Sequence, residues 1–204
     1  MFFRKNIKIE SLNDCLEFAF RMLEKGASQY RHAFHFPALI SGDPHGVEAR
    51  TVILRSFSKQ ERYLLCHSDI RSAKIRQIQN NSRVSWLFYD PKKAFQLRIS
   101  GKAKLHTKDA LADEQWKTVR MTSRMNYLTP LPPGHALDSA SSGLSGSFSE
   151  KVMNSLDKDA GRENFALIKG RIENMDWLVL GMTGHRRAQF SWRKEELKAS
   201  WVVP

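Results

Sequence analysis

The stretch FPALISGDPHGVEARTVILRSF, residues 36–57, carries the clearest fold signal of this sequence. Two runs rich in apolar and β-branched residues flank GDPHG, a turn-forming segment at residues 42–46. Two such runs around a short turn predict a pair of antiparallel strands. This hairpin indicates a mainly β protein.

Further strands and a few helices are expected on both sides of the hairpin. An amphipathic pattern predicts a helix over residues 11–25, with Ser11 as its N-cap and Gly26 as its stop, and two shorter helices over 72–78 and 109–124. Strands are expected over residues 62–67, 83–89, 95–105, 165–172, 175–180 and 188–193. Six to eight strands and two or three helices, without βαβ alternation, favour an antiparallel barrel with peripheral helices.

The chain has 204 residues, which is the length of one domain. Residues 129–149 are rich in Pro, Gly, Ser and Ala, so we expect a mobile loop there. Cys15 and Cys66 lie in apolar segments and are expected in the core. The sequence has no run of 18 apolar residues, and its opening MFFRKNIKIE lacks the apolar core of a signal peptide. We therefore expect a cytoplasmic protein without membrane segments.

The excess of basic residues indicates an anionic partner. Lys and Arg number 33 against 21 Asp and Glu, a net charge of +12. Nucleic acid, an anionic membrane surface and a phosphorylated small molecule would all suit it. The sequence lacks dinucleotide and phosphate-loop glycine motifs, HExxH and GxSxG, so a metal site is not expected and these enzyme classes are disfavoured.

Two segments place cations where an anion would bind. In RTVILR, Arg50 and Arg55 stand at the ends of an apolar run, a pattern that also fits a buried strand with solvated arginines. In HSDIRSAK, residues 67–74, hydroxyls and cations gather at a helix start, where free N–H groups favour a phosphate. An ordinary capped helix with a basic face would look the same.

Two further segments suggest a planar ligand. In FQLRISGKA, residues 95–103, alternation places Gln96 and Arg98 opposite the apolar Phe95, Leu97 and Ile99. The segment from Trp177 to Trp192 combines aromatic rings with guanidinium groups, which could clamp a planar anion or form a plain hairpin with a basic turn.

In order and spacing, RTVILR (50–55), SDIRSAK (68–74), FQLRISGKA (95–103) and HRRAQF (185–190) resemble the pyridoxamine 5'-phosphate oxidase-like family of FMN-binding split barrels. The nearest likeness is to its uncharacterised bacterial branch with the RTVxLR and [ST]DxRSxK motifs. The resemblance spans about residues 36–204, with a variable middle. It implies an antiparallel Greek-key split β-barrel with peripheral helices, formed by residues 1–204 as a single domain.

The resemblance also implies a homodimer with FMN as cofactor and two sites shared between subunits. Ser68, Lys74 and their neighbours would bind the phosphate, the backbone of residues 52–54 and Gln96 would face the ring, and Trp177 and Arg187 would close the site from the other subunit. The implied cofactor-binding residues are Arg50, Thr51, Val52, Ile53, Leu54, His67, Ser68, Arg71, Ser72, Lys74, Gln96, Trp177 and Arg187, and the implied substrate-binding residues are Arg55 and Arg186.

The chain departs from true pyridoxamine-phosphate oxidases at substrate positions. Arg55 replaces a lysine, Ala73 replaces an arginine, and HRRAQF replaces HRLHDRF, so a gap-free match puts Gln189 at the flavin-ring arginine, whose role would pass to Arg187. We therefore expect an FMN-dependent oxidoreductase acting on an unidentified, planar or phenolic small molecule, with no catalytic residue assigned. The alternatives are a genuine pyridoxamine or pyridoxine 5'-phosphate oxidase, a flavin- or haem-binding protein without turnover, and a basic nucleic-acid-binding barrel without flavin.

Overall fold

The computed structural model describes residues 9–44, 46–144, 157–182 and 184–204. Within these residues nine strands form one antiparallel sheet: β1 (Ala38–Asp43), β2 (Gly46–Thr51), β3 (Ser56–Ser58), β4 (Tyr63–Asp69), β5 (Arg83–Asp90), β6 (Phe95–His106), β7 (Phe165–Val179), β8 (Arg186–Arg193) and β9 (Glu196–Val202). The expected mainly antiparallel fold is confirmed. The strands outnumber the expected six to eight because β3 and β9 are short or exposed and carry a weak sequence pattern.

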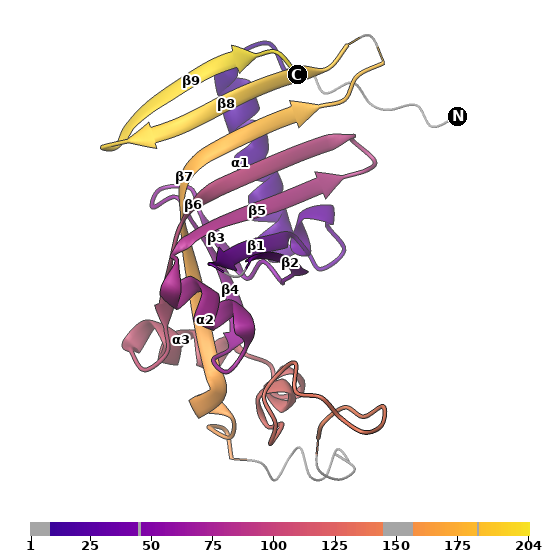
Figure 1. Cartoon of the computed structure of the whole chain (residues 1–204). Coiled ribbons are helices and arrows are strands. Elements are labelled where there is room, and N and C mark those ends of the chain that lie inside the picture. The colour runs from indigo at the N-terminus through magenta and orange to yellow at the C-terminus, as the bar shows by residue number, and fades with distance from the viewer. Residues whose placement is uncertain (1–8, 45, 145–156, 183) are drawn as a thin grey trace.

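Strand β7 organises the sheet. One of its edges pairs with β6 from Leu167 to Val179. Its other edge pairs with β4 in the first half and with β8 in the second. The sheet therefore divides into two lobes, one with β3 and β4 and the other with β8 and β9, as Figure 1 shows.

A bulge marks the point where the lobes separate. The β6–β7 register shifts between Ser100 and Gly101, so Glu173 has no partner of its own. A Cβ on Gly101 would lie 1.8 Å from the carbonyl oxygen of Arg171, and only glycine permits this approach. Residues 165–172 and 175–180, expected as two strands, are one strand bent here, a correction to the sequence prediction.

The segment after β2 closes the barrel. The sequence predicts a strand through Arg55, but β2 ends at Thr51. The N–H groups of Val52 and Leu54 donate to the carbonyls of Pro37 (3.0 Å) and His35 (3.0 Å), and the N–H of Arg55 donates to Leu65 (2.8 Å). The alternation survives without regular pairing, since Val52 and Leu54 are buried while Arg55 is exposed.

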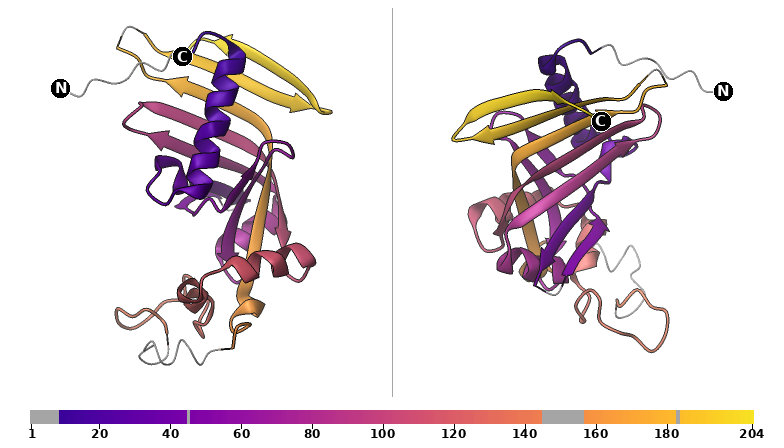
Figure 2. Two further views of the ribbon diagram at one scale, coloured as in Figure 1. Left: turned by 180° about the vertical axis from the view of Figure 1, so that it is seen from behind. Right: turned by 45° about the horizontal axis from the view of Figure 1, so that its top comes forward.

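Helix α1 (Leu12–Ser28) covers one face of the sheet (Figure 2). Ser11 is its N-cap as predicted, in a capping box with Asp14. Gly26 is not its stop, because the helix continues to Ser28. A Cβ at Gly26 would lie 2.7 Å from Phe34, so this glycine allows close packing of the turn at Ala33–His35.

The other helices are short. Helix α2 (Ala73–Asn80) lies as predicted after β4. The expected helix over residues 109–124 is broken: α3 (Ala110–Thr118) ends before Val119, which is extended, and α4 (Met121–Arg124) follows. Residues 129–144 contain no helix or strand, in agreement with the expected loop, and residues 145–149 lie outside the described part.

Two hydrophobic clusters stabilise the fold. The larger one lies between α1 and the sheet and includes Phe34, Phe95 and Trp177. The smaller one, under α3, includes Trp116, Tyr127 and Phe165. Cys15 and Cys66 are buried as predicted, and burial raises the pKa of each thiol to about 12. None of the helices in the described ranges is long and apolar enough to cross a membrane.

Candidate functional site

Arg50 lies at the end of the barrel, between β2 and α2. Its guanidinium donates to the Ser41 hydroxyl (2.6 Å), the Gln77 side-chain oxygen (3.0 Å) and the exposed carboxylate of Glu48 (2.8 Å). Ser41 and Gln77 are buried and bonded to each other at 2.7 Å. Two strands and one helix thus hold Arg50 in a fixed position.

Lys74, on the first turn of α2, shares this end of the barrel. Its ammonium donates to the Ser68 hydroxyl (3.2 Å), and Ser68 lies 3.1 Å from the Ser72 hydroxyl. Ser68 and Ser72 are buried. The structure therefore brings together Arg50, Ser68, Ser72 and Lys74, which the sequence separates by up to 24 positions.

The electrostatics of this group favour an anion. Burial, and then the positive charge of Arg50, lower the pKa of Lys74. Among the residues the structure describes, no carboxylate forms an ion pair with Lys74. The first N–H groups of a helix have no intrahelical partner, and they add to the positive potential at the start of α2. A bound phosphate would supply the missing negative charge. We name Arg50, Ser68, Ser72 and Lys74 the cationic pocket.

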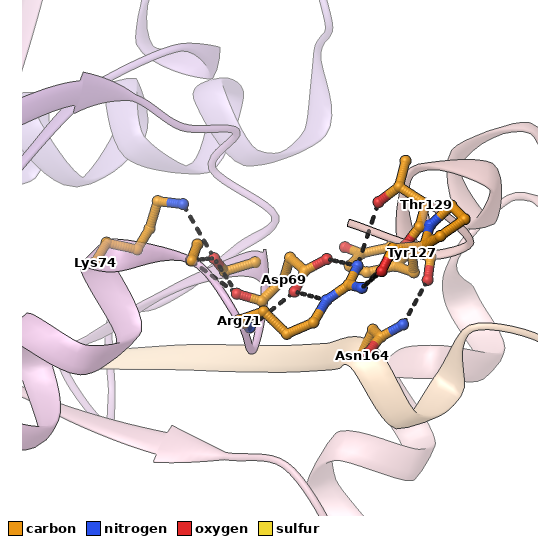
Figure 3. A network of polar contacts seen from close by, with 9 residues as sticks. Asp69, Arg71, Lys74, Tyr127, Thr129 and Asn164 are labelled. Carbon is orange, nitrogen blue, oxygen red and sulfur yellow. Dashed lines mark hydrogen bonds and ion pairs between the residues drawn. The ribbon is translucent and has the colours of Figure 1, made fainter. Parts of the chain in front are cut away.

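Arg71 points away from the cationic pocket, contrary to the sequence prediction. Figure 3 shows its guanidinium reaching toward Thr129, on the side opposite Lys74. It forms two hydrogen bonds with the Asp69 carboxylate (3.0 and 2.7 Å) and donates to the Thr129 carbonyl at 2.8 Å. The Asn164 amide donates to the carbonyl of nearby Tyr127. Arg71 therefore anchors the start of the 129–144 loop.

His67 and Arg55 also differ from their predicted surroundings. The His67 ring packs on Phe165 and its Nε2 lies 3.3 Å from the Gln115 oxygen, so it faces α3 and not the neighbouring Ser68. Burial lowers the pKa of His67 to about 4, which keeps it neutral near pH 7. Arg55 is exposed and close enough to His67 and Tyr127 to affect the pKa of both side chains.

A second polar group lies on the sheet face opposite α1. Across β6, β7 and β8, Gln96 pairs with Leu178 and then with Arg187, while Arg98 pairs with Asp176 and then with Gln189. These two cross-strand rows are adjacent on one face, because side chains of alternate residues point the same way. We call them the polar rows. Arg98, Asp176 and Gln189 also line an open cleft of about 680 Å³.

Asp176 connects the polar rows. Its carboxylate accepts hydrogen bonds from Arg98 (2.7 Å), from Arg187 through Nε (3.0 Å) and Nη2 (2.7 Å), and from Gln189 (3.0 Å). These donors outweigh the opposing effect of burial and lower the pKa of Asp176 to about 2. Arg187 and Gln189 therefore bind the same carboxylate. The sequence did not decide which of these two residues contacts the flavin ring.

Trp177 does not fit its predicted role. Its side chain is fully buried among Phe95 and the α1 side of the core, with no surface to close a site from across an interface. The neighbouring Leu178 lies beside Gln96 on the opposite face. Neighbouring residues of a strand point to opposite faces, so Leu178 and not Trp177 shares the sheet face of Gln96. Arg186 donates to the carbonyl of Ile9 at 2.5 Å.

The remaining predicted residues lie along the segment that closes the barrel. Thr51 is exposed, Ile53 is half-buried, and Val52 and Leu54 are buried. Within the described ranges, the Ile53 N–H donates to no backbone carbonyl, whereas those of its two neighbours do.

Comparison with known proteins finds a similar domain over about half of the chain. Residues 8–107 match the family described as pyridoxamine 5'-phosphate oxidase, FMN-binding domain. The matched part contains the cationic pocket and Gln96, and it ends directly after β6. Among curated proteins, no match is found. The matching motifs do not distinguish a particular branch of this family.

Solved structures confirm the split-barrel fold. A pyridoxamine 5'-phosphate oxidase-related, FMN-binding protein of Nostoc punctiforme PCC 73102 superposes with a TM-score of 0.71 at 21% identity, over 92% of this chain and 96% of that one. PhzG from Burkholderia lata 383, crystallised with tetrahydrophenazine-1-carboxylic acid, superposes with a TM-score of 0.67 at 14% identity, over 100% and 98% of the two chains.

Sequence reasoning missed two residues that support the cationic pocket and two that belong to the polar rows. Ser41 and Gln77 orient Arg50, and Asp176 and Leu178 complete the polar rows. Gln77 was detectable as a polar residue on the apolar side of a short amphipathic helix. The role of Asp176 depends on cross-strand pairing with β6 and β8, which no local pattern specifies.

Proposed function

We propose that this protein binds FMN and acts as an FMN-dependent oxidoreductase on a small molecule. The observation that carries the proposal is the cationic pocket, in which Lys74 and Arg50 lie close together without a carboxylate on Lys74. Two cations, two hydroxyls and a helix start suit a phosphomonoester dianion. The match of residues 8–107 to an FMN-binding domain supports FMN as the phosphate's bearer.

The residues present fit the rest of the cofactor as well. A flavin needs hydrogen bonds at its pyrimidine edge and a positive charge near N1, and Gln96 and Arg187 can supply these. FMN, when bound, supplies the hydride-transfer chemistry. The chain's own part is to grip the phosphate with Arg50, Ser68, Ser72 and Lys74 and to orient the ring with the polar rows.

We further propose a homodimer in which each FMN contacts both chains. Arg50 lies on the sheet face of Leu39 and Trp86, whereas Gln96 and Arg187 lie on the opposite face. One flat ligand cannot contact both faces of the same sheet. A second copy, presenting its polar rows to the cationic pocket of the first, removes this conflict.

Mixed dimers test the shared site. Lys74→Ala chains, refolded with Arg187→Ala chains, form heterodimers in which one site carries both defects and the other carries none. We expect one tightly bound FMN per heterodimer. If every site belongs to one chain, each heterodimer site keeps one defect and no tight binding returns.

The substrate is proposed to be planar or phenolic and not pyridoxamine phosphate. Arg and Lys are not interchangeable at tight anion sites, so Arg55 in place of lysine argues against the vitamin. Tetrahydrophenazine-1-carboxylic acid, with which PhzG was crystallised, belongs in the substrate screen as a tricyclic carboxylic acid. The second candidate function, suggested by the family description, is a genuine pyridoxamine 5'-phosphate oxidase. Aerobic conversion of pyridoxamine 5'-phosphate to pyridoxal phosphate and peroxide at about 1 per second or faster would support it.

The purified protein itself provides the first test. A yellow preparation that releases FMN on denaturation supports the proposal. A colourless protein that shifts DNA in a gel would support the nucleic-acid-binding alternative, since a net charge of +12 suits either anion.

A further inference from the structure

Asp176 has an unusual position for a carboxylate in this basic protein. It lies at the centre of the polar rows, with its side chain 13% exposed, and receives hydrogen bonds from three side chains on two neighbouring strands. Two guanidinium charges and one carboxylate charge leave a net charge of +1 on this patch. Arg187 binds Asp176 through Nε and Nη2, and within the described ranges its Nη1 donates to no other group.

We propose that Asp176 is a positioning residue that fixes Arg187 beside the flavin and limits the positive charge presented to it. This inference rests on the proposed FMN function. The two-point contact fixes the plane of the guanidinium, because both hydrogen bonds lie along one edge of it. The opposite edge, with Nη1, is left to donate to a ligand placed next to Gln96 and Leu178.

The charge of Asp176 has a predictable effect on the cofactor. Reduction of flavin by two electrons and one proton adds one negative charge at the pyrimidine end of the ring. Each nearby positive charge favours that reduced form, and each negative charge disfavours it. Asp176 offsets one of the two guanidinium groups, so it holds the FMN midpoint potential lower than Arg98 and Arg187 alone would set it.

Two substitutions separate charge from packing. Asp176→Asn keeps the size of the side chain and one oxygen for Arg187 but removes the negative charge. Arg98→Gln removes a positive charge from a side chain that is 51% exposed and so perturbs the fold little. The matched control is Glu173→Gln, which removes a carboxylate from the same strand at the bulge, outside the polar rows.

The experiment is a redox titration of the FMN-loaded proteins, followed by absorbance. We expect the ratio of the affinities for reduced and oxidised FMN to be at least tenfold higher in Asp176→Asn than in wild type. For a two-electron couple this is an upward shift of about 30 mV. Arg98→Gln should shift the potential downward, and Glu173→Gln should leave it unchanged.

The outcomes separate the inference from the function beneath it. If wild-type protein binds FMN but Asp176→Asn leaves the potential unchanged or lowers it, Asp176 is only a structural residue and the inference is wrong. If Asp176→Asn does not fold, the absence of a downward shift in Arg98→Gln overturns it equally. If wild-type protein binds no FMN at all, the proposed function fails together with the inference.

Discussion

The cationic pocket and the polar rows both contain two cationic side chains, but these side chains lie in different electrostatic surroundings. In the cationic pocket, burial and then repulsion by Arg50 lower the pKa of Lys74. In the polar rows, Arg98 and Arg187 share one carboxylate, and the pKa of Asp176 falls to about 2. Under the proposed function an external anion completes the first group, whereas the carboxylate of Asp176 offsets part of the charge of the second from within. Cation count alone therefore does not locate a phosphate site. Arg98 and Arg187 share a largely buried carboxylate, whereas Arg50 pairs with the exposed Glu48 and Lys74, among the described residues, pairs with no carboxylate.

The same contrast applies within HSDIRSAK. Arg71 and Lys74 are three positions apart, yet Arg71 is bound to Asp69 and Thr129, while the hydrogen bond of Lys74 within the described residues goes to the Ser68 hydroxyl. An arginine with an internal carboxylate contributes to structure. A lysine that faces hydroxyls and another cation is available to a ligand.

The largest expected effect is on FMN binding by the cationic pocket. Lys74→Ala and Arg50→Ala should each weaken FMN binding by about 1.5–3 kcal/mol, the scale of one charge-assisted hydrogen bond. Fluorescence quenching measures the affinity. The matched control is Arg76→Ala, which removes an exposed cation from the same helix. Equal losses in all three variants would mean that only the overall charge matters.

The polar rows should respond to acid. Because the folded state lowers the pKa of Asp176 from 3.8 to about 2, its ionised form stabilises the fold above pH 4. That contribution, about 2 kcal/mol at most, disappears as the pH falls from about 4 to about 2. Urea unfolding of wild type and Asp176→Asn should therefore converge in this range. A constant difference across it would contradict the ion-pair account.

The stability contributed by the cationic pocket should change at alkaline pH, because its titrating group, Lys74, is a cation and not an anion. The unfolded chain keeps the Lys74 proton up to about pH 10.5, whereas the folded apo-protein releases it earlier. The unfolding free energy contributed by Lys74 thus rises as the pH increases through the window between its lowered pKa and 10.5. Thermal unfolding should show this rise in wild type and lose it in Lys74→Met. Saturating FMN should also suppress it, because a phosphate restores the proton.

The smallest expected effect comes from the hydroxyls. Ser72→Ala removes a buried hydroxyl that bonds to the Asp69 carbonyl (2.7 Å) and lies beside Ser68. The loss in FMN affinity should be about 0.5–1.5 kcal/mol, the net value of one neutral hydrogen bond. Calorimetric titration is suited to a change of this size. A loss as large as that of Lys74→Ala would show that the hydroxyls, and not the cations, dominate the pocket.

The antiparallel architecture could be predicted from the sequence because it depends on local patterns, and so could the proximity of Ser68, Ser72 and Lys74, whose binding of a phosphate stays a prediction. Alternation identified β5 and β6, and the strand-to-helix turn identified Ser68, Ser72 and Lys74. Arg50 was found from its place at the end of an apolar run. These residues come together because β2, β4 and α2 meet at one end of the barrel.

The polar rows could not be predicted in the same way. Their geometry depends on the register of β7 against β6 and β8, and a shift of one position replaces Leu178 by Trp177. The bulge at Gly101, where the Arg171 carbonyl approaches closely, shifts the register of β7 against β6. Arg71 was misplaced for a related reason, since its partner Thr129 is 58 positions away.

The most direct test of the central claim compares FMN with riboflavin, which lacks the phosphate. Wild type and Arg76→Ala should bind FMN at least 100-fold more tightly than riboflavin, because the cationic pocket acts on the phosphate alone. In Lys74→Ala this ratio should fall by about tenfold or more, the equivalent of one charge-assisted hydrogen bond, while riboflavin affinity stays the same. A ratio near one in wild type, or an unchanged ratio in Lys74→Ala, would contradict the assignment of the cationic pocket to the FMN phosphate.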